Sequence, residues 1–192
     1  MPPSKDHEFG YLEVLIAAIE ALSTPPLPYC LIGALALGAY GRPRATHDVD
    51  LLILTDSATS HSYLDPLRAK GFAVASDWHE SNPMAQNVVT RLAHPLAPDF
   101  PLDLIFATSP LHKNALDRRK LFDLHGIQVP VSSAEDLILL KLSASRPRDF
   151  DDVMGIIGNA GAPLDLDYLW SWADRLGLQS ELHYVLISAK RE

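Results

Sequence analysis

Apolar and polar positions follow two different periods along the chain. Between residues 8 and 22 the apolar side chains recur every three or four positions, which predicts an amphipathic helix. Three prolines at positions 25, 26 and 28 are expected to end that helix. The apolar run at 29–32 is short, as is typical of a buried strand, and it leads into a tight turn at Gly33. The N-terminal region therefore predicts a helix, a strand and a turn in succession.

The rest of the chain continues to mix the two periods. Prolines cluster between residues 92 and 102, so an irregular hairpin is expected to join the strands on either side. Ser133 precedes a helical pattern and offers a hydroxyl that can cap it. The sequence therefore predicts an α/β chain with a helical C-terminal tail. Further helices are expected at 35–40, 60–70, 110–119, 134–144, 148–157, 167–176 and 180–189, and strands at 48–54, 72–74, 87–92, 102–106 and within 122–131.

Composition restricts the class of protein. Hydrophobic residues make up 47% of the 192 positions and charged residues 21%, which is ordinary for one globular domain and excludes disorder as the main description. The formal charge of −8 argues against a broad surface for polyanions, so contact with nucleic acid would need a local basic patch. Residues 118–120 are either that patch or a solvated face. Cys30 is the single cysteine, which rules out an internal disulfide and predicts an inert buried thiol.

The apolar segments also bear on the location of the protein. The N-terminal residues lack the basic-then-apolar order of a signal peptide. No apolar run approaches the length that spans a bilayer. A cytoplasmic protein without a membrane partner is therefore expected.

Two carboxylates lie close together on a predicted strand. Asp48 and Asp50 are two residues apart, so strand alternation points both side chains to the same face. Asp103 lies on a later predicted strand, and Asp99, in the Pro-rich segment, is its weaker alternative. Three such carboxylates can supply the oxygen ligands that Mg²⁺ prefers and leave positions open for phosphate oxygens. Without a metal, Asp48 and Asp50 would be the solvated edge of a strand, and Asp103 would be an ordinary exposed strand residue.

Two groups of spaced motifs lie between residues 29 and 158. The first group is Gly33-Ala34, then Arg44-x-Thr46-x-Asp48-x-Asp50, then Asp103. This group resembles the nucleotidyltransferase superfamily, whose fold is shared with DNA polymerase β. The second group is the run at 130–138 followed by Lys141, Arg146, Arg148, Asp149 and Asp152. Its order is similar to that of bacterial nucleotidyltransferases of the AbiEii type, which are toxins of type IV toxin–antitoxin systems.

The resemblance implies a fold, a division into domains and a set of site residues. The implied fold is a mixed β-sheet flanked by helices, with a nucleotidyltransferase domain over residues 1–158 and a C-terminal helical segment, 159–192, packed on it. Asp48, Asp50 and Asp103 are implied as catalytic ligands of Mg²⁺ or Mn²⁺, with Asp103 also a candidate proton acceptor. The implied contacts to a nucleoside triphosphate such as ATP are Gly33, Ala34, Arg44, Thr46, Lys141, Arg146 and Arg148.

Each implied nucleotide contact has a plain structural alternative. Gly33 either lets backbone amides approach a phosphate at the start of a helix or serves only a tight turn. A serine or second glycine often follows this glycine in the superfamily, whereas Ala34 offers no hydroxyl. Arg44 and Thr46 are nucleotide contacts or simple loop residues. Lys141 is a phosphate ligand or a solvated helix residue, and the arginines after it bind phosphate or form local surface pairs.

The implied activity is transfer of a nucleoside monophosphate from an NTP to a hydroxyl-bearing acceptor, with Mg²⁺ or Mn²⁺ required. The toxin resemblance implies the tRNA 3′ end or a protein side chain as acceptor, and a cognate antitoxin as partner. Two alternatives are open: a catalytically degenerate module that binds nucleotide or a partner, and a small-molecule transferase of the aminoglycoside type. The sequence has neither a Gly-Lys-Ser/Thr phosphate loop nor a Gly-x-Ser-x-Gly nucleophile turn, so it does not favour another chemistry.

Overall fold

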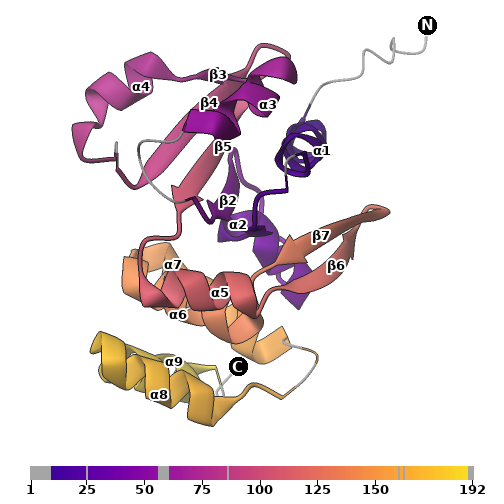
Figure 1. Cartoon of the computed structure of the whole chain (residues 1–192). Coiled ribbons are helices and arrows are strands. Elements are labelled where there is room, and N and C mark those ends of the chain that lie inside the picture. The colour runs from indigo at the N-terminus through magenta and orange to yellow at the C-terminus, as the bar shows by residue number, and fades with distance from the viewer. Residues whose placement is uncertain are drawn as a thin grey trace, which may run out of the picture. The chain divides into compact units, whose positions relative to one another are not determined.

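The computed structural model describes residues 10–24, 26–55, 61–85, 87–159, 161 and 163–189. The chain divides into two compact units, whose elements are labelled in Figure 1. Unit 1 comprises Met1–Tyr29 and Thr46–Ala107, and unit 2 comprises Cys30–Ala45 and Thr108–Glu192. Each unit is therefore assembled from two separate stretches of sequence.

The strands of unit 1 place two predicted acids side by side. These strands are β2 (Val49–Ile53), β3 (Ala73–Val74), β4 (Val89–His94) and β5 (Ala97–Phe106). Their order is β3-β4-β5-β2. β4 pairs antiparallel with both β3 and β5, whereas β2 and β5 run parallel. The parallel register aligns Asp50 with Asp103, which are distant in the sequence.

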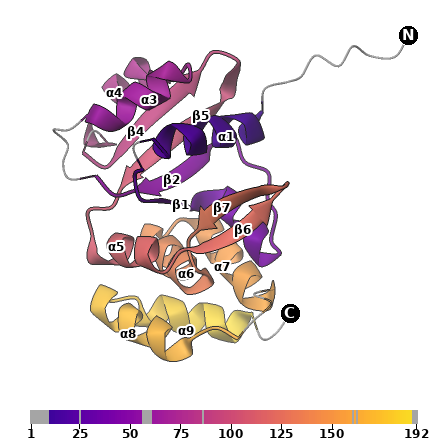
Figure 2. The ribbon, with the colours of Figure 1, turned by 45° about the vertical axis from the view of Figure 1, so that its right-hand side comes forward.

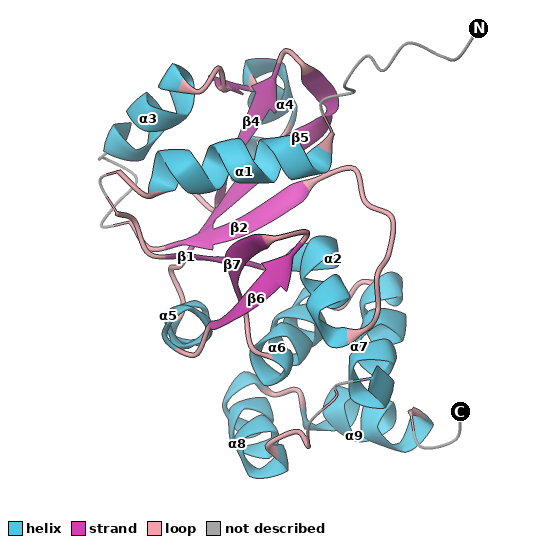
Figure 3. Ribbon diagram, turned by 90° about the vertical axis from the view of Figure 1, so that its right-hand side faces the viewer, coloured by secondary structure: helices cyan, strands magenta, loops and turns pink. Residues whose placement is uncertain are grey.

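The helices of unit 1 are α1 (Tyr11–Leu22), α3 (Leu64–Ala69) and α4 (Ser76–Ser81). In α1, Val14, Leu15, Ala18 and Leu22 are buried at the spacing of one helical face. The helix packs against α3, β5 and β2, and Figure 3 shows it lying across these strands. The predicted N-terminal helix is confirmed from Tyr11 onwards, and its first two predicted residues lie outside the described part of the chain.

Two features of unit 1 differ from the expectation. The predicted hairpin is confirmed, with a register shift between Leu92 and His94, but its connection is shorter than expected, because β5 already begins at Ala97, which pairs with His94. Pro98 and Pro101 lie in the first part of β5, before Leu102, where the pairing with β2 begins. On that side of the strand no backbone N–H is needed for pairing, so prolines are tolerated. Helix α4 is absent from the expected elements, because none of its residues is buried and it has no apolar stripe.

The strands of unit 2 form a parallel pair and a hairpin. They are β1 (Tyr29–Leu31), whose first residue belongs to unit 1, β6 (Lys120–Leu124) and β7 (Ile127–Val131). Their order is β1-β7-β6. β1 runs parallel to β7, and β6 and β7 are joined as an antiparallel hairpin. Gly126 in the hairpin turn has a φ of +86°, a conformation that favours glycine.

The helices of unit 2 are α2 (Gly33–Ala36), α5 (Pro110–Asp117), α6 (Ala134–Ala144), α7 (Pro147–Asn159), α8 (Leu166–Leu176) and α9 (Gln179–Ser188). α6 is buried at eight of its eleven positions and packs against α5, α7 and α8, as Figure 2 shows. The predicted cap is confirmed, because Ser133 Oγ accepts a hydrogen bond from the Asp136 backbone N–H at 3.1 Å. α9 packs against α7 and α8. The predicted domain boundary at residue 158 stays a prediction.

A buried carboxylate joins α5, α6 and α8. Asp136 of α6 accepts hydrogen bonds from Ser133 Oγ at 2.6 Å, from Asn114 Nδ2 of α5 at 3.2 Å, and from the Tyr168 hydroxyl of α8. Arg118 Nε donates to it at 3.2 Å, and the Arg118 guanidinium lies 3.8 Å from the centroid of the Tyr168 ring. Burial and the hydrogen bond to Asp136 raise the pKa of Tyr168, so its hydroxyl remains a donor. The first residue of the candidate basic patch is thus engaged within unit 2.

The strands and helices together confirm the predicted α/β class. Parallel and antiparallel strand pairs occur in both units, helices flank them, and the C-terminal part is helical. Among the described helices, none combines the length and the apolar character needed to cross a bilayer. The predicted inert cysteine is also confirmed, because Cys30 is fully buried and burial raises the pKa of its thiol to about 12.

Candidate functional site

Three carboxylates converge on neighbouring strands of unit 1. Asp50 of β2 is in register with Asp103 of β5, and Asp48 immediately precedes β2. One ligand oxygen from each of the three residues lies within 4.8 Å of the other two. Asp103 is buried, whereas Asp48 and Asp50 are half-buried. The cluster therefore has one fixed member and two members that a solvated ion can reach.

Contacts within unit 1 orient the first of these acids. Thr46 Oγ1 donates a hydrogen bond to Asp48 Oδ1 at 2.5 Å. His47, between them in sequence, stacks on Phe100 of β5 with the ring centroids 6.2 Å apart. Thr46 therefore positions Asp48 directly. Its implied contact with nucleotide stays a prediction.

A guanidinium from outside the sequence motifs binds the third acid. Arg91 of β4 lies opposite Asp103 in the antiparallel register of β4 and β5. Its Nε donates to Asp103 Oδ1 at 2.7 Å and its Nη2 donates to Oδ2 at 2.5 Å. The only available sequence signal for Arg91 is its place in a predicted strand, and pairing it with Asp103 requires the register of the hairpin.

The donor set of the cluster suits a hard divalent cation. All three candidate ligands are carboxylate oxygens, the type that Mg²⁺ and Mn²⁺ prefer. Three carboxylates and one guanidinium leave two formal negative charges, which a dication would balance. Asp99, the alternative ligand, is exposed on β5 and is not a member of the cluster. Metal binding by Asp48, Asp50 and Asp103 stays a prediction that this geometry fits.

The predicted phosphate turn lies in unit 2. Gly33 has a φ of +67°, so the tight turn requires glycine at this position. It opens α2, which continues into a 3₁₀ helix at Leu37–Tyr40, where one short helix is expected from the sequence. Ala34 is buried. Binding of phosphate by the backbone amides of this turn stays a prediction.

Replacing Gly33 with alanine is expected to lower the free energy of unfolding by about 1–2 kcal/mol, because a left-handed backbone costs other residues roughly that much. Gly38→Ala is the matched control, since Gly38 lies in the adjacent 3₁₀ helix and an added Cβ would meet nothing within 4 Å. Urea denaturation of both variants measures the difference. Equal stability of the two variants would show that the turn tolerates a side chain.

Lys141 is a buried member of an ion-pair network in unit 2. Its Nζ lies 2.7 Å from Asp152 Oδ2 and 3.4 Å from Asp149 Oδ1. Asp152 Oδ1 also lies 3.4 Å from Arg44 Nε. The alternative of a solvated helix lysine is therefore wrong, and Asp149 is buried with Lys141 rather than paired with Arg148 at the surface. A phosphate contact by Lys141 or Arg44 stays a prediction.

The remaining predicted basic residues are exposed. The side chains of Arg146 and Arg148 lie at the surface, and the Arg146 backbone N–H donates to Asp149 Oδ2 at 3.2 Å. The structure thus groups the predicted site residues in two sets. The set in unit 1 is Thr46, Asp48, Asp50 and Asp103, and the set in unit 2 that shares one network is Arg44 and Lys141.

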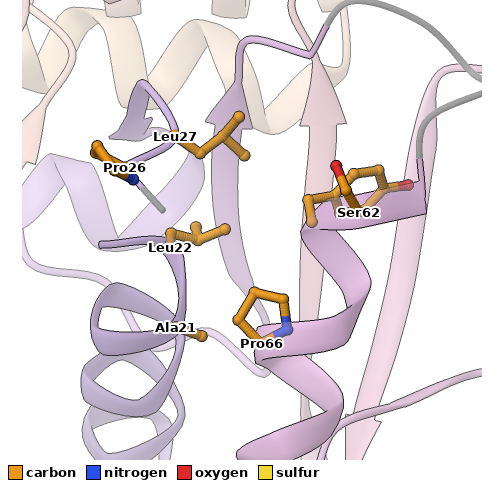
Figure 4. Close-up of a pocket in the computed structure, with 7 residues that line it drawn as sticks. Ala21, Leu22, Pro26, Leu27, Ser62 and Pro66 are labelled. Atoms are coloured by element: carbon orange, nitrogen blue, oxygen red, sulfur yellow. The ribbon is translucent and has the colours of Figure 1, made fainter. Parts of the chain in front are cut away.

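Unit 1 has a small hollow whose lining residues include none of the predicted site residues. It has a volume of about 60 Å³, whereas pockets for small-molecule ligands are roughly 300–1,000 Å³. The hollow is therefore too small for a nucleotide. Figure 4 shows its lining residues, which are Ala21, Leu22, Pro26, Leu27, Ser62, Tyr63 and Pro66.

Two comparisons of the amino-acid sequence give no match. No protein-family model matches the chain, and no curated protein matches its sequence.

Solved structures, in contrast, share the fold. The antibiotic-resistance factor ANT(2'')-Ia is 14% identical, covers 90% of this chain and 96% of its own, and gives a TM-score of 0.58. The lincosamide antibiotic adenylyltransferase LnuA is 14% identical, covers 75% of this chain and 94% of its own, and gives 0.51. TM1012 from Thermotoga maritima, a proposed nucleotidyltransferase, is 15% identical, covers 73% of this chain and 88% of its own, and gives a TM-score of 0.50. The chain therefore has the fold of the nucleotidyltransferases.

Proposed function

We propose that the protein is a metal-dependent nucleotidyltransferase that moves a nucleoside monophosphate from an NTP to a hydroxyl acceptor. The observation that carries this proposal is the convergence of Asp48, Asp50 and Asp103, with ligand oxygens within 4.8 Å of one another on neighbouring strands. The likeness of the fold to the adenylyltransferase LnuA supports the same reaction class.

The roles of the acids follow from their chemistry. Asp48, Asp50 and Asp103 would hold Mg²⁺ or Mn²⁺, which when bound would act as a Lewis acid and neutralise charge on the triphosphate. The acceptor oxygen attacks the α-phosphorus, the bond from that phosphorus to the bridging oxygen breaks, and pyrophosphate leaves. The proton of the acceptor hydroxyl passes to a carboxylate, for which Asp103 is the proposed base.

The proposed contacts with the nucleotide are those that the resemblance implies. The backbone amides at Gly33 and Ala34 donate hydrogen bonds to phosphate oxygens, because N–H groups at a turn into a helix point outward. Arg44 contributes a guanidinium whose Nε is already oriented by Asp152 at 3.4 Å. Further proposed contacts are Thr46, Lys141, Arg146 and Arg148.

The acceptor defines two versions of the proposal. The resemblance to AbiEii-type toxins favours the tRNA 3′ end or a protein side chain, with a cognate antitoxin as partner. A small hydroxyl-bearing molecule is the second candidate. It is supported by the near full-length structural likeness to ANT(2'')-Ia, which has also been solved in complex with adenylyl-2''-tobramycin.

Transfer of label tests the proposal and identifies the acceptor. Purified protein is incubated with each α-³²P-labelled NTP and Mg²⁺ or Mn²⁺, in separate reactions with total tRNA, cell-extract protein and an aminoglycoside. We expect label in one acceptor fraction, dependent on the metal and abolished by EDTA. Nucleotide binding without label in any fraction would instead identify a catalytically degenerate module.

A further inference from the structure

Arg91 has a position at the carboxylate cluster for which the proposed reaction gives no role. Its two donors, Nε and Nη2, engage both oxygens of Asp103 at 2.7 Å and 2.5 Å. Such a bidentate pair of a guanidinium and a carboxylate fixes the orientation of both groups. The ion pair is half-buried, since the side chains of Arg91 and Asp103 are 23% and 11% exposed, so solvent screens it less than a surface pair.

Helix α4 holds Arg91 from a second direction. The guanidinium carbon lies 4.5 Å from the centroid of the Trp78 ring, which is the geometry of a cation–π contact. His79 Nε2 accepts a hydrogen bond from the Arg91 backbone N–H at 3.1 Å. α4 has no buried residue of its own. Its contacts with the rest of unit 1 therefore include two that hold the side chain and the backbone of Arg91.

The charge of Arg91 acts on the whole cluster. An arginine guanidinium is not deprotonated in proteins, so Arg91 is a permanent cation. It contacts Asp103 directly, and the ligand oxygens of Asp48 and Asp50 lie within 4.8 Å of that of Asp103. Three carboxylates this close together repel one another when no cation is present.

We infer that Arg91 is the resident counter-cation of the cluster: it holds Asp103 in place in the metal-free protein and weakens the binding of a divalent cation. This inference rests on the proposed function, in which the three acids bind a metal. The physical reason is competition, because a fixed positive charge repels a dication and occupies lone pairs of a shared ligand. Arg91 is therefore a positioning residue. Its removal should lower the stability of the metal-free protein and raise the affinity for a divalent cation.

The affinity for Mn²⁺ alone tests this inference. The electron paramagnetic resonance signal of the free ion measures how much Mn²⁺ is unbound. We expect Arg91→Gln to bind Mn²⁺ about tenfold more tightly than the wild type, because it removes the charge. Arg91→Lys retains the charge and is expected to bind within about twofold of the wild type. Arg68→Gln is the matched control, since Arg68 pairs with Asp65 at the exposed surface of the same unit, and its affinity should equal that of the wild type.

Thermal unfolding in EDTA gives the second readout. Arg91→Gln should unfold at a lower temperature than the wild type without metal, and Mn²⁺ should raise its Tm by more than it raises that of the wild type. Arg91→Met, whose apolar stem can still pack on Trp78, replaces Arg91→Gln if that variant does not fold. Equal or weaker Mn²⁺ binding by the folded charge-removing variant would overturn the inference alone. Absence of Mn²⁺ binding by the wild type would overturn both the inference and the metal requirement of the proposed function.

Discussion

Replacing Asp48 or Asp50 with asparagine is expected to lower the rate of nucleotide transfer by at least about 10³-fold, with the fold intact. A metal ion stabilises transition-state charge by several kcal/mol, and each 1.4 kcal/mol is about tenfold in rate. Both side chains are half-buried rather than part of the apolar core, so the neutral amide should not disturb packing. Single-turnover kinetics with saturating labelled NTP measure the loss.

Asp99→Asn is the matched control for this prediction. Asp99 lies on β5, the strand that carries Asp103, but it is exposed and outside the cluster. Its variant should transfer label at the wild-type rate. Circular dichroism of all variants separates a catalytic loss from unfolding. If Asp48→Asn and Asp50→Asn retain wild-type rates, the carboxylates do not bind the catalytic metal and the proposed mechanism is wrong.

The spacing of Asp48 and Asp50 is a local signal, and local signals could be read from the sequence. Strand alternation gives their shared face without any knowledge of the partner strand. The same is true of Ser133, whose hydroxyl is expected to cap α6 and accepts from the Asp136 N–H. The left-handed φ at Gly33 also agrees with a turn inferred from one glycine after a strand.

The neighbours of Asp103 depend on pairing between strands and could not be read in this way. Asp50 and Asp103 become adjacent only because β2 and β5 run parallel in one register, and a slip of one residue would turn Asp103 to the other face. The position of Arg91 opposite Asp103 depends in turn on the register of β4 and β5. Pro98 and Pro101 obscured that register, because prolines in a strand usually argue against pairing.

Lys141 shows a third reason why sequence reading fails. A lysine on a helix is most often solvated, and α6 carries charged residues among its apolar ones. The helix is nevertheless buried on most sides, so its polar residues need partners within the fold. The partners of Lys141 come from α7, where Asp149 and Asp152 are one turn apart on the same face. The partners of a buried lysine are set by the packing of the helices and cannot be read from the residues of α6 alone.

Lys141→Met is expected to lower the free energy of unfolding by about 3–5 kcal/mol, the range for removing one partner of a buried ion pair. The Lys141 ammonium lies 2.7 Å from Asp152 and 3.4 Å from Asp149, and all three side chains are at most 11% exposed. The variant leaves Asp149 buried without its cation, while Asp152 retains only Arg44 at 3.4 Å. Urea denaturation at neutral pH measures the loss from the midpoint and the slope of the transition.

Lys70→Met is the matched control, because Lys70 pairs with Glu20 at 2.5 Å with side chains 42% and 56% exposed, and surface pairs contribute only about 0–1 kcal/mol. Adding Asp149→Asn to Lys141→Met should recover part of the loss, since it removes the unpaired buried charge. A loss no larger than that of Lys70→Met would mean that the buried network contributes little to the fold. Weaker NTP binding by Lys141→Met would in that case support the proposed phosphate contact.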